Sequence, residues 1–266
     1  MKNQSIAIVT GASRGIGAAT AIVLAQRGYH LTLVARDQEC LADIGKKVMS
    51  MGVEVMSLPG DLSDLSFVES IAQKVWQRWG KIDVLVNNAA WREITTMRDI
   101  TIESWERTLR VCLTAPAFLA RWVAQYMEQR RSGVIVNVSS IMAERAAGIC
   151  PAYIASKGAM NSLTFELASL YGPHGIRVVG ISPGAIDTEM SRDLDKTMSP
   201  PNDPTLKEDM IMLRRWGTPE EVAKAIAWVS ADDASYLTGT TLVLDGGLLH
   251  QHFPHSLRSQ DVSDRL

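Results

Sequence analysis

Short apolar runs alternate along the chain with longer segments in which apolar and polar residues are spaced as on the two faces of a helix. The apolar runs are predicted strands, at residues 5–10, 31–35, 53–58, 82–86, 134–139, 176–182 and 240–245. Strands that alternate with helices at this spacing form a parallel sheet with helices on both faces. The pattern therefore predicts an α/β fold, a doubly wound parallel sheet of seven strands in a single domain.

Several residues mark where the predicted helices begin or break. Ser63 and Thr101 precede helical segments and are the predicted N-caps. Residues 218–221 form a capping box with proline at the first helical position. The segment 102–129 contains Pro116 near its middle, and a proline inside a helix kinks or splits it. We therefore expect an interruption in this long helix.

Composition narrows the class of protein. The chain has 266 residues, of which 46% are hydrophobic and 21% charged, as in one soluble α/β domain with a large core. The net charge of -2 gives no basic excess, so we expect neither nucleic acid nor a membrane as partner. No apolar run approaches the ~20 residues of a membrane span, and the first strand begins too early for a signal peptide. Cys40, Cys112 and Cys150 lack paired spacing, which favours reduced thiols and a cytoplasmic location.

A glycine-rich turn follows the first predicted strand and leads into an alanine-rich helix. It reads Gly11-Ala12-Ser13-Arg14-Gly15-Ile16-Gly17. Such a turn presents free backbone N–H groups and a helix dipole to an anion, and glycine lets the backbone approach a phosphate closely. The spacing differs from the G-x-G-x-x-G of the commoner dinucleotide fingerprint. A glycine loop without a ligand is the alternative, but its place after the first strand favours a Rossmann-type nucleotide site.

The residue after the second predicted strand bears on the choice of nucleotide. In a doubly wound sheet this position reaches the adenosine ribose, where a carboxylate suits NAD and an arginine suits the 2′-phosphate of NADP. Arg36 occupies it, and Arg14 lies in the glycine turn. Asp37 follows one residue later and is the carboxylate that would argue for NAD. The two cations favour NADP(H) as the cofactor.

Tyr153 and Lys157 stand four residues apart at the start of a strongly helical segment. Residues with this spacing share one face of a helix. An ammonium beside a phenol favours the phenolate, so the pair suits a tyrosine that acts as a proton donor or acceptor. Ser140 ends the fifth predicted strand and would add a hydroxyl nearby. A lone Y-x-x-x-K pattern occurs by chance on surface helices, so the prediction depends on the other motifs.

Together these motifs resemble the short-chain dehydrogenase/reductase family over roughly residues 3–249. The motifs are Thr10-Gly11-x-x-x-Gly15-x-Gly17, Asn87-Asn88-Ala89, Ser140, Tyr153-x-x-x-Lys157 and Pro183-Gly184. Within the family the pattern is similar to 3-oxoacyl-[acyl-carrier-protein] reductases and to sugar dehydrogenases.

The resemblance implies a role for each motif. Tyr153 exchanges a proton with the carbonyl or alcohol oxygen, Ser140 stabilises the charge on that oxygen, and Lys157 binds the nicotinamide ribose. Asp61 is expected at the adenine and the pair Ile186 and Thr188 at the carboxamide. The residues expected to bind NADP(H) are Gly11, Ser13, Arg14, Gly15, Ile16, Gly17, Arg36, Asp61, Leu62, Asn88, Ala89, Ala90, Val111, Tyr153, Lys157, Pro183, Gly184, Ile186 and Thr188. No metal site is expected.

Two positions depart from the family pattern. Cys112, in Val111-Cys112-Leu113, stands where the family has a fourth catalytic residue, an asparagine. That asparagine helps to hold a water between Lys157 and solvent, partly through its backbone carbonyl, which a cysteine keeps. We therefore expect a slower proton relay and not an inactive enzyme. Ala90 replaces the usual glycine after Asn-Asn-Ala.

The leading hypothesis is an NADPH-dependent reductase of a carbonyl substrate, either a 3-oxoacyl thioester or a sugar or polyol. We expect substrate choice to depend on Trp91, residues 142–147, Ala185 and a lid at residues 189–213. Glu144 and Arg145 follow Ser140 closely and would make the rim of the pocket polar, which favours a hydroxylated or charged substrate. Alternatives are an NADP-binding sensor or assembly protein with little catalysis, suggested by Cys112, and a methyltransferase, which would leave Tyr153 and Lys157 unexplained.

The sequence also raises the questions of assembly and of the C-terminus. The family resemblance implies a homotetramer, or a homodimer, packed through the helices at 102–129 and 152–172. Residues 250–266 follow the predicted domain of residues 1–249. They contain His250, His252 and His255, but no carboxylate or thiol at ligand spacing, so an ordinary polar tail is favoured over a metal site.

Overall fold

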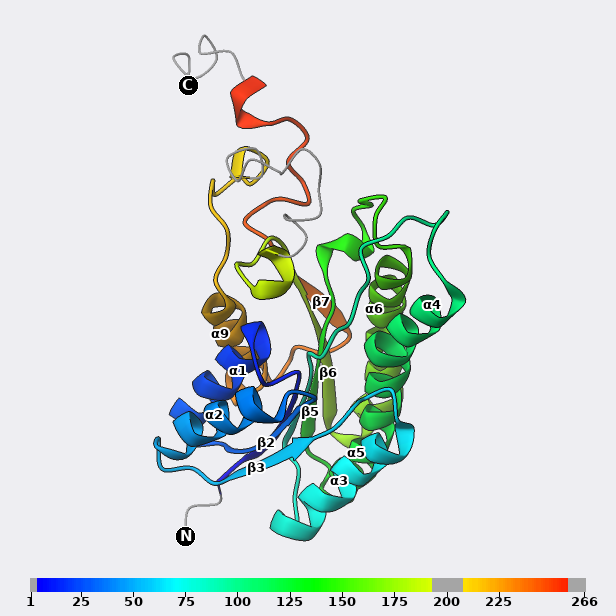
Figure 1. Ribbon diagram of the computed structural model, residues 1–266. Coiled ribbons are helices and arrows are strands. Elements are labelled where there is room, and N and C mark those ends of the chain that lie inside the picture. Colours follow the sequence, from blue (N-terminus) through cyan, green and yellow to red (C-terminus); the bar gives the residue numbers. More distant parts are fainter. Residues whose placement is uncertain (1–3, 193–207, 258–266) are drawn as a thin grey trace.

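The protein is seen in a computed structural model that describes residues 4–192 and 208–257. Seven strands form one parallel sheet in the order β3-β2-β1-β4-β5-β6-β7 (Figure 1). The strands are β1 (Ile6–Thr10), β2 (His30–Ala35), β3 (Val55–Pro59), β4 (Val84–Asn87), β5 (Gly133–Val138), β6 (Ile176–Pro183) and β7 (Thr240–Leu244). The predicted seven-stranded parallel sheet in a single domain is confirmed.

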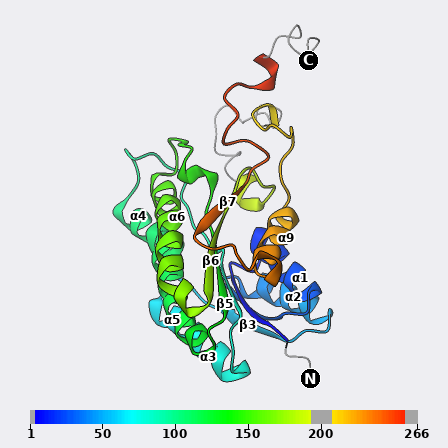
Figure 2. The ribbon, with the colours of Figure 1, turned by 180° about the vertical axis from the view of Figure 1, so that it is seen from behind.

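Helices cover both faces of this sheet (Figures 1 and 2). One layer holds α1 (Gly15–Gln26), α2 (Gln38–Met49) and α9 (Pro219–Val229). The opposite layer holds α3 (Leu65–Trp79), α5 (Ala115–Arg130) and α6 (Pro151–Tyr171), and α4 (Ile102–Leu109) packs beside α6. Strand β1 shows why both layers are apolar: Ala7 and Val9 point into one and Ile6 and Ile8 into the other.

The predicted helix over residues 102–129 is interrupted, as its proline suggested. Helix α4 ends at Leu109, a π-helical turn occupies Arg110–Thr114, and α5 begins at Ala115 with Pro116 as its second residue. Pro116 has no N–H to donate to the carbonyl of Cys112, four residues earlier. A wider π turn is a common way to accommodate such a break, often near a functional site.

The predicted helix starts are correct in two cases and wrong in one. The Thr101 side chain accepts from the N–H of Ser104, and residues 218–221 form the expected capping box. The predicted cap Ser63 is not the N-cap of α3. That cap is Asp64, whose carboxylate accepts from the N–H of Ser66. Ser63 lies one residue before this cap and donates its backbone N–H to Asp61 at 2.8 Å.

The segment after β7 continues beyond the predicted domain end at residue 249. The His255 ring lies 3.1 Å from the carbonyl of Ile211, and Ser256 donates its N–H to Asp209 at 2.9 Å. These contacts join the C-terminal segment to residues 208–211. In the described part of the chain no helix has the length and apolar character of a membrane span.

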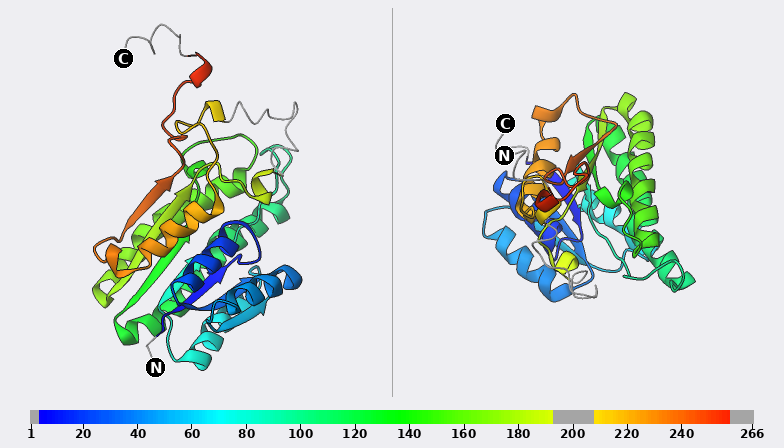
Figure 3. Two further views of the ribbon diagram at one scale, coloured as in Figure 1. Left: turned by 90° about the vertical axis from the view of Figure 1, so that its left-hand side faces the viewer. Right: turned by 90° about the horizontal axis from the view of Figure 1, so that it is seen from above.

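The strand order sets where a ligand would bind. Chain connections run outward in opposite directions from the adjacent strands β1 and β4, which leaves a crevice beyond their carboxyl ends. The segments that follow β4, β5, β6 and β7 extend from this same end of the sheet, as the left view of Figure 3 shows.

Buried polar side chains connect the sheet to helix α6. The amide of Asn87 on β4 donates to the Asn137 side-chain oxygen on β5 at 3.0 Å, and also to the Pro116 carbonyl on α5 at 3.3 Å. The Asn137 amide donates to the Thr164 hydroxyl of α6 at 3.0 Å. Each of the side chains Asn87, Asn137 and Thr164 is at most 4% exposed. Such bonds fix the position of α6 relative to the strand ends, since breaking them would leave buried polar groups unpaired.

The substitution Asn137→Ala should destabilise the fold, because it removes two buried hydrogen bonds, one to Asn87 and one to Thr164, although Asn87 keeps its bond to Pro116 and Thr164 its bond to the Met160 carbonyl. We expect a loss of about 0.5–1.5 kcal/mol for each of the two hydrogen bonds, seen as a lower midpoint of thermal unfolding. Ser162→Ala, at an exposed position of the same helix, is the matched control and should leave the midpoint unchanged. Equal midpoints for Asn137→Ala and the wild type would contradict this role.

Candidate active site

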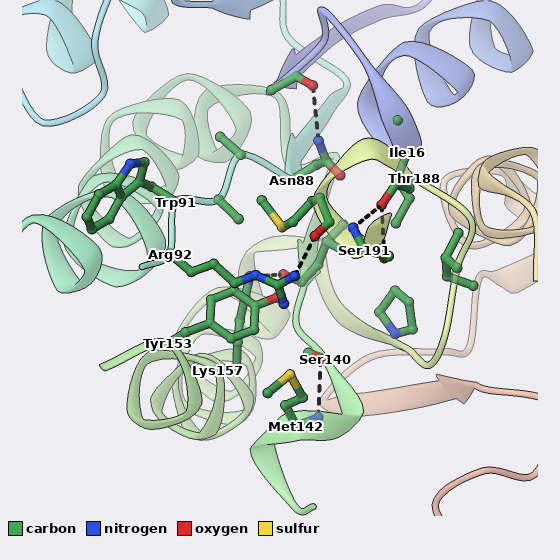
Figure 4. A pocket seen from close by; sticks show the side chains of 18 of the residues that line it. Ile16, Asn88, Trp91, Arg92, Ser140, Met142, Tyr153, Lys157, Thr188 and Ser191 are labelled. Carbon is green, nitrogen blue, oxygen red and sulfur yellow. Dashed lines mark hydrogen bonds between the residues drawn. The ribbon is translucent and has the colours of Figure 1, made fainter. Parts of the chain in front are cut away.

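A cavity of about 930 Å³ opens at the carboxyl ends of the strands. Its walls come from the turn after β1, the ends of β2 and β3, the segments after β4, β5 and β6, and the start of α6. Figure 4 shows Asn88, Ser140, Tyr153, Lys157 and Thr188 around it. All the predicted motifs therefore contribute to one cavity, although they are far apart in the sequence.

The glycine turn has a shape that excludes side chains. Gly11 and Gly15 have φ angles of +67° and +54°, which favour glycine. A Cβ on Gly17 would lie 2.1 Å from the carbonyl oxygen of Gly11, so no other residue fits without a backbone shift. Helix α1 begins at this turn with no side-chain cap and no acidic residue in its first turn. Its first N–H groups and positive dipole end are thus free to face an anion such as a pyrophosphate.

Asn88 joins the glycine turn to the segment after β4. Its backbone N–H donates to the Thr10 hydroxyl at 3.0 Å, and its side-chain amide donates to the Thr10 carbonyl at 2.8 Å. A Cβ on Gly11 would lie 2.8 Å from the Cα of Ala89. Asn88 therefore holds the floor of the cavity together at the point where the strand order reverses.

Charged residues gather at the end of the cavity next to β2 and β3. Arg14, Arg36, Asp37 and Asp61 all line it. The Asp37 carboxylate caps α2 by accepting from the N–H of Cys40 at 3.0 Å, and this bond holds its pKa below the usual value. Arg14 forms an exposed ion pair with Glu189 at 3.0 Å.

Asp61 is also held as a carboxylate. Partial burial acts to raise its pKa, but the Ser63 N–H bond and the nearby cations of Arg36 and Arg107 bring the pKa below its ordinary value. Arg107 lies 3.8 Å from the Asp61 carboxylate and stacks over the Trp91 ring at 4.8 Å. Asp61 is thus a fixed hydrogen-bond acceptor at this end of the cavity.

Lys157 is the most deeply buried charged group of the cavity, at 2% exposure. Its ammonium donates to the carbonyl of Val138, the last residue of β5, at 2.7 Å. The same ammonium lies 5.4 Å from the centre of the Tyr153 ring, one helical turn earlier on α6. Since a buried charge needs such partners, Lys157 has a fixed position beside the phenol.

Ser140 lies two residues after Val138, the last residue of β5. Its hydroxyl accepts from the N–H of Met142 at 3.2 Å, which starts a short 3-10 turn over Ile141–Ala143. Ser139 donates its hydroxyl to the carbonyl of Lys157 at 3.0 Å, so this strand end is bonded to α6 in both directions. Ser140 and Tyr153 are 9% and 8% exposed and line the same cavity.

Cys112 is buried and belongs to the π-helical turn before α5. Its thiol donates to the Trp91 carbonyl at 3.2 Å, and its sulfur accepts from the Trp91 N–H at 3.3 Å. The side chain does not line the cavity. A thiol has one donor and one weak acceptor, and both are used here to hold the backbone of the segment that follows β4.

The predicted cofactor-binding residues all line the cavity except Gly17, which lies behind the turn against Gly11. Their individual roles stay predictions. Of the predicted lid at residues 189–213, the residues Glu189, Met190, Ser191 and Met210 line the cavity, and residues 193–207 lie outside the described part of the chain.

Sequence reasoning missed Arg92, Trp216 and Leu248, which also line the cavity. Only the proximity of Arg92 to the Asn-Asn-Ala motif could have indicated it. Glu144, which the sequence suggested for the pocket rim, is exposed and does not line the cavity, whereas Arg145 does. Residues 4–192 and 208–257 contain no cluster of three or more histidine, cysteine, aspartate or glutamate side chains that could hold a metal ion.

Known proteins share this sequence over most of its length. A family model described as enoyl-(acyl carrier protein) reductase matches residues 11–249. Human dehydrogenase/reductase SDR family member 4 is 36% identical over 249 residues, which cover 92% of this chain and 87% of that protein. A 3-oxoacyl-[acyl-carrier-protein] reductase from Thermotoga maritima is 33% identical over 246 residues, covering 92% of this chain and 97% of that protein.

Solved structures agree with the sequence relatives. YwfH, an NADPH-dependent reductase involved in bacilysin biosynthesis, has a TM-score of 0.88 at 26% identity and covers 92% of this chain and 98% of its own. An NAD⁺-bound xylitol dehydrogenase has a TM-score of 0.86 at 28% identity, with 93% and 100% covered. By its matched family model, its relatives and its fold, this chain belongs to the short-chain dehydrogenase/reductase family and is an oxidoreductase.

Proposed function

We propose that the protein transfers a hydride between NADP(H) and a carbonyl or secondary alcohol. The observation that carries this proposal is the position of Lys157, buried beside Tyr153 in a cavity that also holds Ser140 and the glycine turn. This combination provides an acid–base group, a hydrogen-bond donor for an oxygen and a site for a dinucleotide in one place.

The cavity fits a dinucleotide. The glycine-rich turn at residues 11–17, where Gly11 and Gly17 leave no room for a Cβ, and the uncapped start of α1 suit the pyrophosphate, and Asp61 offers an acceptor for the adenine. Lys157 would hold the nicotinamide ribose, with Ile186 and Thr188 at the carboxamide. When bound, NADP(H) supplies or accepts the hydride.

The chain's own residues handle the oxygen of the substrate. Tyr153 donates a proton to the carbonyl oxygen in reduction and removes it from the alcohol in oxidation. Ser140 donates a hydrogen bond to the same oxygen and stabilises the negative charge that develops there. The ammonium of Lys157, held by the Val138 carbonyl, places a positive charge beside the Tyr153 ring.

The charged end of the cavity supports NADP(H) over NAD(H). Arg14 and Arg36 are cations that suit a 2′-phosphate. Asp37, the carboxylate that would favour NAD(H), is engaged with the N–H of Cys40. A 2′-phosphate on Arg14 would compete with Glu189. Relatives point both ways, since YwfH is described as NADPH dependent and the xylitol dehydrogenase is NAD⁺-bound.

The sequence leaves two candidate classes of substrate, a 3-oxoacyl thioester and a sugar or polyol. The Thermotoga maritima relative carries the name of the first activity and the xylitol dehydrogenase that of a polyol enzyme. A catalytically weak NADP-binding sensor or assembly protein is the alternative of another class. The intact group of Ser140, Tyr153 and Lys157 argues for catalysis.

Cys112 bears on the proton relay. We keep the interpretation that relay through the Cys112 carbonyl is slower than with the usual asparagine, because a thiol is a weaker hydrogen-bonding group than an amide. The two bonds to the Trp91 backbone support a positioning role for this side chain.

Assembly and location are also proposals. A homotetramer, or a homodimer, through α5 and α6 is supported by the exposed apolar side chains Phe118, Phe165 and Leu170 on these helices, at 37%, 49% and 54% exposure. A cytoplasmic location is supported by the free thiols of Cys40, Cys112 and Cys150.

The substitution Tyr153→Phe should lower turnover of a ketone with NADPH by about 10²–10⁴-fold, the range typical of a lost general acid. NADPH binding, measured by titration calorimetry, should persist because the ring and Lys157 remain. Tyr236→Phe, at a fully exposed tyrosine, is the control and should leave turnover unchanged. Undiminished activity of Tyr153→Phe would exclude this mechanism.

The substitution Arg36→Ala should reduce the ratio of kcat/KM for NADPH to that for NADH by about 10–100-fold, as expected for one lost charged hydrogen bond. The value for NADH itself should change little, since that cofactor has no 2′-phosphate. Arg98→Ala, at an exposed arginine away from the cavity, is the control. An unchanged ratio would mean that Arg36 does not select the cofactor.

The substitution Cys112→Asn should raise kcat and change its pH dependence, because an amide restores a strong donor and acceptor next to the Trp91 backbone. Cys112→Ala, which has neither, should lower kcat. Steady-state rates across pH with a saturating ketone test both variants. Identical pH profiles for the wild type and Cys112→Asn would refute the relay interpretation.

A further inference from the structure

Arg92 extends into the cavity beside the proposed reaction centre and has no role in the mechanism above. It belongs to the segment after β4, is half-buried and lines the cavity. Its guanidinium carbon lies 5.7 Å from the centre of the Tyr153 ring. Figure 4 shows the Arg92 side chain lying across that ring, with Ser140 and Met142 beyond it.

The Arg92 guanidinium is only partly used by the protein. One of its nitrogens donates to the Met190 carbonyl at 2.6 Å, which connects the segment after β4 to the segment after β6. A guanidinium has five N–H donors in a planar fork, and this bond uses one of them. Within residues 4–192 and 208–257, no carboxylate lies within 4.0 Å of Arg92.

The other charged groups of the cavity do not neutralise Arg92. Among the described residues, three carboxylates line the cavity, and Asp37 and Asp61 lie at the opposite end, next to β2 and β3. Glu189 is paired with Arg14 at 3.0 Å. A second cation, Arg145, lines the cavity after Ser140 and donates to the carbonyl of Leu248. The side of the cavity next to Tyr153 is therefore positively charged, although the whole chain has a net charge of -2.

Apart from these cations, that side of the cavity is largely apolar. Its walls include Trp91, Met142, Met190, Met210, Trp216 and Leu248. A half-buried cation with unused donors in apolar surroundings attracts an anion more strongly than a solvated one, since water screens it less. The planar fork of an arginine matches the two oxygens of a carboxylate.

We propose that Arg92 binds a carboxylate of the substrate, so that the substrate is an oxo acid or the corresponding hydroxy acid with an otherwise apolar body. The inference rests on the proposed function, because Tyr153 must hold the reacting oxygen while Arg92 holds the carboxylate. Their closeness requires the carboxylate to lie only a few bonds from the reacting carbon. Arg92 is thus a specificity-determining residue, and Arg145 adds positive charge without direct contact to Tyr153.

The test compares acetoacetate with its methyl ester, two ketones that differ in charge at one end. Wild-type protein with NADPH should show a higher kcat/KM for the acid than for the ester. In Arg92→Gln the ratio of acid to ester should fall about 10–100-fold, the effect of one lost charged hydrogen bond. Arg92→Lys should retain part of the preference. General damage to the active site would lower kcat/KM for the acid and for the ester alike, so it would leave their ratio unchanged.

Arg98→Gln, an exposed arginine of the same segment, is the control and should keep the wild-type ratio. An equal ratio in the wild type and Arg92→Gln would overturn the proposal and leave Arg92 as a structural link to Met190. In that outcome ester reduction would still support the proposed reductase.

A second measurement is independent of turnover. Titration calorimetry with butyrate and methyl butyrate, on protein saturated with NADP⁺, reports carboxylate binding without any reaction. Butyrate should bind the wild type about 10–100-fold more tightly than Arg92→Gln, and methyl butyrate should not distinguish them. If no ketone is reduced but butyrate still binds through Arg92, the proposed function fails and the carboxylate site stands. Equal butyrate affinities would overturn the site.

Discussion

The buried hydrogen bonds of Asn87, Asn137 and Thr164 are the constraint on which the rest of the site depends. They join β4, β5 and α6 in the buried interior, where the loss of either bond would leave a polar atom of Asn137 unpaired. Because α6 carries both Tyr153 and Lys157, these bonds set the distance of the two side chains from the strand ends. The bond from Lys157 to the Val138 carbonyl then fixes the ammonium beside the phenol.

The cations of the cavity form two groups, one at the end next to β2 and β3 and the other beside Tyr153. Arg14 and Arg36 stand at the adenosine end, and Arg92 and Arg145 stand at the end next to Tyr153. An acidic protein thus presents cations at both ends of one binding site. The arrangement suits two anionic groups, the phosphates of a dinucleotide and the carboxylate that we infer for the substrate.

The fold accommodates a cysteine, Cys112, at the position where the family has an asparagine. The π-helical turn and Pro116 separate α4 from α5, and the thiol occupies the bend with two bonds to the backbone of Trp91. These bonds hold the segment that also carries Arg92. The thiol of Cys112 is therefore connected, through the short segment after β4, to the part of the cavity that Arg92 lines.

The sequence by itself determined the seven strands, their alternation with helices and the order of the motifs, because these follow from local spacing and from which residues are buried. It also placed Tyr153 and Lys157 on one helical face, since four residues make about one turn. It missed the N-cap at Asp64, where two neighbouring polar residues competed for one position. Only the tertiary structure decided that Arg92 lies on Tyr153 and that Cys112 bonds to Trp91. Such contacts join residues distant in sequence, and they depend on how loops from different strands pack at the sheet edge, which no local pattern encodes.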